Sequence, residues 1–91
     1  MIEKVLFCDG HDNAFMGLMW RFGHTAPIAA YSRPTIIKNL MSEGMTHDDA
    51  EEFFEFNIIG AWVGEGTPCF IETIGIDEAK EVVKDYSDEE V

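Results

Sequence analysis

Three short apolar runs constrain the fold of this chain more than any other feature. They are residues 5–8, 27–31 and 69–74, and a glycine or a proline follows each of them within three residues. Continuous apolar runs of this length, bounded by turn residues, are typical of buried strands. We therefore expect a small three-stranded β-sheet.

Helical patterns fill the intervals between the runs. Residues 13–22 carry apolar side chains at helical spacing, with Asp12 as a suitable N-cap and Gly23 at the C-terminal end. A second helix is expected over 34–44, since proline suits a first helical turn and Gly44 suits a helix end.

The segment after Gly44 gives the clearest helical signal. Thr46 and Asp49 resemble a capping box that opens a helix over about 48–58. At 100° per residue one side of this helix is apolar apart from one asparagine: Phe53, Phe54, Asn57, Ile58 and Ala61. The opposite side is acidic: Asp48, Asp49, Glu51, Glu52 and Glu55. Phe56 and Ile59 interrupt the acidic side, so either the helix ends near Asn57 or the two side chains mark a contact surface.

A last helix over 77–86 is expected to bury three small apolar side chains, Ala79, Val82 and Val83. The predicted order is then β-α-β-α-α-β-α. This is an α+β fold with a three-stranded sheet and three to four helices, packed mainly on one face. We expect a single domain over 1–86 and an acidic tail over 87–91.

The charge is unevenly distributed. Residues 1–42 have a net charge of +1, whereas residues 43–91 have fifteen acids and two lysines, a net charge of −13. Direct binding of nucleic acid is disfavoured, because phosphate contacts need clustered lysine and arginine. The natural complement is a protein with a basic surface. The alternative is that the charge only keeps the protein soluble and monomeric.

The chain carries no signal for a membrane or for export. No apolar run approaches the ~20 residues of a membrane span. The N-terminus lacks the basic and then apolar layout of a signal peptide. We therefore expect a location in the cytoplasm. Cys8 and Cys69 are interpreted as buried, reduced thiols, with a disulfide left open if their strands are neighbours.

A first polar cluster follows the first apolar run. Oxygen and imidazole ligands for a divalent metal are offered by four residues: Asp9, His11, Asp12 and His24. With Arg21 the same cluster would suit a small molecule. The alternative is structural, with Asp9 in a turn, Asp12 as a helix cap and His11 exposed.

A second cluster lies around Asn57. A buried asparagine needs hydrogen-bond partners, and the glycine-rich turn after it supplies backbone groups. The cluster also includes Trp62, Glu65 and Thr67, and the functional alternative is a ligand pocket formed by Asn57, Trp62 and Arg21. No catalytic nucleophile with its base is recognisable by spacing, and the glycines match neither a Walker loop nor a dinucleotide fingerprint. These patterns give little support for catalysis, and they indicate no cofactor beyond the divalent metal.

Three segments, residues 10–17, 44–52 and 56–68, together resemble a group of small proteins of tailed phages and prophages. The most specific part is Asn-x-x-Gly-Ala-Trp-x-Gly-Glu-x-Thr-Pro, which begins at Asn57. The resemblance covers roughly residues 9–71 and carries no assigned active residues. It implies a phage-type accessory protein that is made in the cytoplasm of a bacterial host.

The leading hypothesis is a small acidic binding module that acts on a host or phage protein, with inhibition by DNA mimicry as a less favoured version. The residues expected to contact a ligand or partner are Asp12, Arg21, Phe56, Asn57, Ile59, Trp62 and Glu65. The alternatives are a domain that binds a metal or small molecule, and a structural homo-oligomer.

Overall fold

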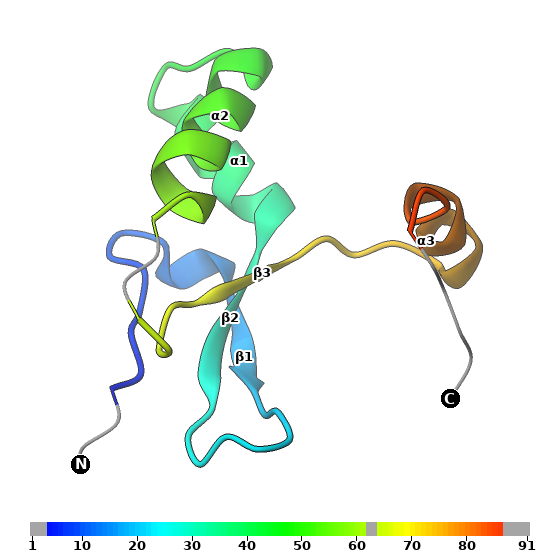
Figure 1. Cartoon of the computed structure of the whole chain (residues 1–91). Helices are drawn as coiled ribbons and strands as arrows, with labels where there is room; N and C mark the ends of the chain where they lie inside the picture. The colour runs from blue at the N-terminus through cyan, green and yellow to red at the C-terminus, as the bar shows by residue number, and fades with distance from the viewer. Residues whose placement is uncertain (1–3, 62–63, 87–91) are drawn as a thin grey trace.

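The computed structural model describes residues 4–61 and 64–86 (Figure 1). The described chain is an α+β fold with a three-stranded mixed sheet and three α-helices, together with one 3₁₀ and one π-helical segment. In chain order the elements are η1 (Asp12–Ala14), β1 (Phe15–Met19), β2 (Ile28–Ser32), α1 (Arg33–Ser42), α2 (His47–Phe53), η2 (Phe54–Ile59), β3 (Cys69–Ile71) and α3 (Ile76–Val82). None of the described helices is long and apolar enough to cross a bilayer.

The sheet has β2 at its centre, with the order β1-β2-β3. β1 pairs with β2 as an antiparallel hairpin, and β3 pairs with β2 in parallel. A parallel neighbour requires a crossover, and α1, α2 and η2 supply it. In Figure 1 α1 continues directly from β2 and lies beside α2 at the end of the sheet.

The N-terminal prediction is wrong in two places. Residues 5–8 form no strand, and the helix expected over 13–22 is instead the short η1 turn followed by β1. The spacing of the apolar residues here is compatible with a strand as well as with a helix. The pairing with β2 therefore decides the conformation. Gly17 lies beside a β-bulge and has a φ of 147°, which a helix excludes. Asp12 therefore caps no helix of the predicted length.

Residues 5–8 lie instead along the glycine-rich loop that precedes β3. The backbone N–H of Leu6 donates to the carbonyl of Gly66 at 3.3 Å. A methyl group at Gly66 would overlap the carbonyl oxygen of Lys4, so this close approach requires glycine.

Both predicted helix starts in the middle of the chain are confirmed. The Ser32 side chain accepts from the backbone N–H of Thr35 at 3.3 Å, with Pro34 in the first turn of α1. The Thr46 side chain accepts from the N–H of Asp49 at 3.1 Å at the start of α2. Such caps satisfy backbone donors that have no partner within the helix.

The helix that begins at α2 widens into the π-helical segment η2. Ala50 of α2 and Phe54 and Ile58 of η2 lie on the inward side, and Phe54 is fully buried. Asn57 is exposed, so the prediction that it shares the apolar side is wrong. A helical wheel with uniform steps of 100° fails where the helix period changes.

The C-terminal elements are shorter than predicted. β3 ends at Ile71, and residues 72–75 lead away from the sheet to α3, which lies apart from the rest of the molecule (Figure 1). No residue of α3 is buried, and the predicted burial of Val82 and Val83 is wrong. The tail predicted over 87–91 lies outside the described residues.

The core is a column of aromatic rings centred on Tyr31, which is 1% exposed. Its ring meets Phe15 at a centroid distance of 5.6 Å and Phe70 at 6.3 Å, and Phe70 meets Phe54 at 5.2 Å. The Tyr31 hydroxyl accepts from the backbone N–H of Cys8 at 2.8 Å. Tyr31 therefore joins all three strands, η2 and the N-terminal segment.

Replacing Tyr31 with phenylalanine tests the polar part of this core. The Y31F variant should lose about 1 kcal/mol of unfolding free energy, because the Cys8 N–H loses its acceptor. Urea unfolding followed by circular dichroism measures the loss. Y86F is the control, since Tyr86 is exposed and should change the stability by less than about 0.5 kcal/mol. Equal effects of the two variants would contradict the assignment.

Candidate functional site

The first predicted cluster is not assembled. Asp9 and Asp12 are exposed at the turn before β1, whereas Arg21 and His24 lie in the β1–β2 connection, at the other end of the hairpin. Among the described residues no three histidine, cysteine or acidic side chains are grouped so that they could hold a metal ion. The structure therefore gives the predicted metal ligands no common centre.

His11 has a structural role instead. Its Nδ1 lies 3.0 Å from the side-chain amide nitrogen of Asn39 on α1. Asn39 and Asn13 also exchange two amide hydrogen bonds, of 2.8 and 2.9 Å. The Asn39 amide nitrogen can only donate, so His11 Nδ1 is the acceptor in this contact. This network fastens η1 to α1.

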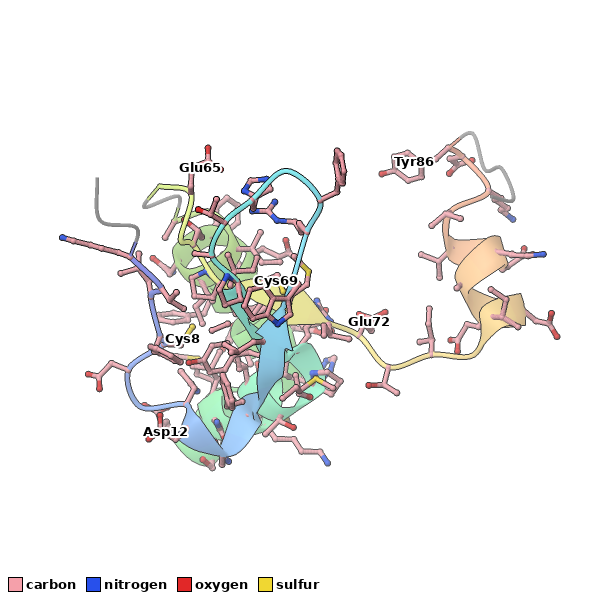
Figure 2. All side chains as sticks on the ribbon, turned by 90° about the horizontal axis from the view of Figure 1, so that it is seen from below. Cys8, Asp12, Glu65, Cys69, Glu72 and Tyr86 are labelled. Carbon is pink, nitrogen blue, oxygen red and sulfur yellow. The ribbon has the colours of Figure 1, made fainter. Side chains whose placement is uncertain are left out.

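The second predicted cluster is also dispersed. Asn57 is exposed on η2, and Glu65 is exposed in the loop before β3 (Figure 2). Trp62 lies outside the described residues. The loop satisfies its own polar groups, because the Thr67 hydroxyl donates to the carbonyl of Gly64 at 2.6 Å. The structure does not unite Asn57 with Arg21, which is in the β1–β2 connection.

A groove of about 460 Å³ lies over α2 and η2. It combines two carboxylates, two aromatic rings, a thioether and an amide, from Asp49, Glu52, Phe53, Phe56, Met45 and Asn57. We refer to these six residues as the acidic–aromatic groove. Phe56 is 76% exposed and Phe53 38% exposed, so both rings are available to a partner.

The groove is the outward side of a helix whose inward side belongs to the core. Asp49, Glu52, Phe53 and Phe56 recur at three- and four-residue intervals, opposite the inward Ala50. The sequence prediction found Phe56 and Asn57 but placed Phe53 inward. It also left Met45, Asp49 and Glu52 out of the site.

Ile59, the other apolar residue predicted to interrupt the acidic side, is 47% exposed near the end of η2. It does not line the groove. The prediction that Phe56 and Ile59 both face outward is nevertheless confirmed, and together they extend an apolar surface along η2.

An arginine site elsewhere in the molecule has the same chemistry as the groove. The Arg33 guanidinium lies 5.1 Å from the centre of the Phe54 ring. Its nitrogens pair with Glu55 at 3.5 Å and with Glu72 at 3.3 Å. Here one cation meets a ring face and two carboxylates, the two kinds of partner that the groove also presents.

The two cysteines are free thiols and half-buried. Burial raises the pKa of the Cys8 thiol above its ordinary value. Burial also raises the pKa of Cys69, although the positive charge of Arg21 acts in the opposite direction. Both side chains therefore behave as small apolar groups near neutral pH.

Comparison of the chain with protein-family models, curated proteins and solved structures gives no match. The chemistry of the groove is therefore argued from its own residues.

The thiols should react slowly in the folded protein. Alkylation proceeds through the thiolate, and a raised pKa lowers the thiolate fraction at pH 8. Iodoacetamide labelling followed by mass spectrometry should therefore be severalfold slower in the native state than in urea. The native rate should still rise above pH 9. Single variants C8A and C69A assign the two rates, and a plateau below pH 8.5 would contradict the raised pKa values.

Proposed function

We propose that this protein is a small binding module whose acidic–aromatic groove captures a cationic segment of a partner protein. The observation that carries the proposal is the juxtaposition of Asp49 and Glu52 with the rings of Phe53 and Phe56 in one groove. A lysine or arginine side chain satisfies both kinds of group at once.

The energetics favour a cationic ligand over a neutral one. A cation over an exposed aromatic face contributes about 0.5–1 kcal/mol, and each exposed ion pair adds a similar amount. Apolar neighbours in the ligand would cover the two exposed rings and contribute more through burial. A partner segment that fits the groove therefore has alternating basic and apolar side chains.

The charge of the chain assists the encounter. Fifteen of its eighteen acids lie in residues 43–91, the half that contains the groove. A field of one sign accelerates association with a partner of opposite sign, and salt weakens this effect. The same charge opposes phosphate backbones, so the proposed partner is a basic protein and not a nucleic acid.

The motif that begins at Asn57 and its resemblance to phage proteins support a setting for this function. In our proposal the protein is a phage-type accessory product that acts on a host or phage protein in the bacterial cytoplasm. Inhibition through DNA mimicry is the less favoured version. Its acids gather on α2, η2 and the α3 region instead of following an extended line.

A pair of labelled peptides tests the groove directly. One peptide alternates arginine and leucine, and its partner has glutamate in place of arginine. Fluorescence anisotropy should show binding of the arginine peptide only, and the binding should weaken at ~0.5 M salt. F56A and E52Q should each raise Kd roughly two- to fivefold, which corresponds to about 0.5–1 kcal/mol.

E78Q is the matched control, because it removes one charge from α3 without touching the groove. If E78Q weakens binding as much as E52Q, only net charge is recognised and the groove is not the site. Host lysate then identifies the natural partner. That partner should be retained by the wild type at low salt and lost with F56A.

A further inference from the structure

Within residues 4–61 and 64–86, no segment covers the apolar residues of α3. α3 has seven residues, and none of them is buried. Helices shorter than about 12 residues are marginal in water unless an apolar face is packed. Residues 72–75 hold α3 away from the sheet in both views (Figures 1 and 2). We refer to residues 72–86 as the arm.

The arm has one apolar side. At 100° per residue, Ile76, Ala79 and Val83 fall within about 60° of one another. Ile76 is 70% exposed, and Val82 and Tyr86 are also exposed, at 59% and 75%. The acids occupy the opposite side of the helix: Asp77, Glu78, Glu81 and Asp85. Such a helix packs its apolar side against another surface.

A second uncovered apolar surface lies on the β1–β2 hairpin. β1 is an edge strand of the described sheet, and an unpaired edge readily joins another chain. Five large apolar side chains of β1 and the following connection are exposed: Phe15, Met16, Leu18, Trp20 and Phe22. We refer to these five residues as the hairpin surface.

The two surfaces have complementary charge. The hairpin, residues 15–32, contains Arg21 and no acid. The arm contains five acids and two lysines. Two copies of this strongly acidic chain repel each other over most of their surface, but the arm of one copy attracts the hairpin of the other.

We propose that two copies of this chain form a dimer by exchanging arms, with each α3 packed on the hairpin surface of the other copy. The ion pair of Arg33 with Glu72 fastens the root of the arm, so that the arm leaves its own body. The contact is reciprocal, as two-fold symmetry requires.

The exposed area suffices for such a dimer. The nine large apolar side chains of the arm and hairpin surface expose on the order of 1,000 Å² per chain, given about 150–250 Å² for each aromatic residue. A stable interface needs about 800 Å² from each partner. Burial of most of this area, on both faces of β1, reaches this value without any contribution from the groove.

Sedimentation equilibrium with matched variants tests the exchange. The wild type should be a dimer at ~100 µM, and I76S and W20S should each raise the dimer dissociation constant at least tenfold, about 1.4 kcal/mol. F56S is the control, because Phe56 is 76% exposed but belongs to the groove, and it should leave the constant unchanged. A monomeric wild type overturns the proposal. So does a dimer that only F56S weakens.

A measurement on the wild type does not depend on how the variants fold. In a sample that mixes isotope-labelled and unlabelled chains, isotope-filtered NOEs should connect Ile76 and Val83 of one copy with Trp20 or Phe22 of the other. If these NOEs occur only within one chain, the arm packs on its own hairpin and arm exchange is wrong.

Discussion

The fold depends on the aromatic column through Tyr31. β2 is the one strand with two neighbours, and Tyr31 places its ring where β1 and β3 both contact it. Phe70 extends the column to Phe54, and the Phe54 ring receives the Arg33 guanidinium. The single hydroxyl of Tyr31 holds the N-terminal segment through Cys8. The N-terminal segment, β1 and β3 therefore meet at the Tyr31 side chain, and Phe70 joins η2 to them.

A core of this kind leaves much apolar surface unused. In the part of the chain that the structure describes, the buried core residues all come from residues 14–54, although apolar side chains occur along the whole sequence. The apolar side chains that the core does not bury lie in the groove, on the hairpin surface and on the arm. In a monomer these apolar side chains stay in contact with water. Contiguous exposed apolar surface of this kind marks interaction sites. The two proposed interactions use these three surfaces.

The sequence predicted those elements whose signals are local. The caps at Ser32 and Thr46 need only residues within four positions, so α1 and the start of α2 were predicted correctly. The apolar residues around Gly17 fit the helical period as well as the strand period. Only the pairing with β2 makes this segment a strand. The groove was predicted in part, because the π-helical turn that exposes Asn57 has no recognised signal in the sequence.

Charge separates the two proposed interactions. A strongly acidic protein associates with itself only where its acids are absent, and residues 13–42 are its longest acid-free stretch. A basic partner, by contrast, is attracted to α2 and η2, where carboxylates surround the exposed rings. The hairpin surface therefore lies in an acid-free stretch of the chain, whereas the acidic–aromatic groove lies among acids. Since the groove takes no part in arm exchange, a dimer would present two grooves, and a partner with two basic segments would bind it more tightly than either segment alone.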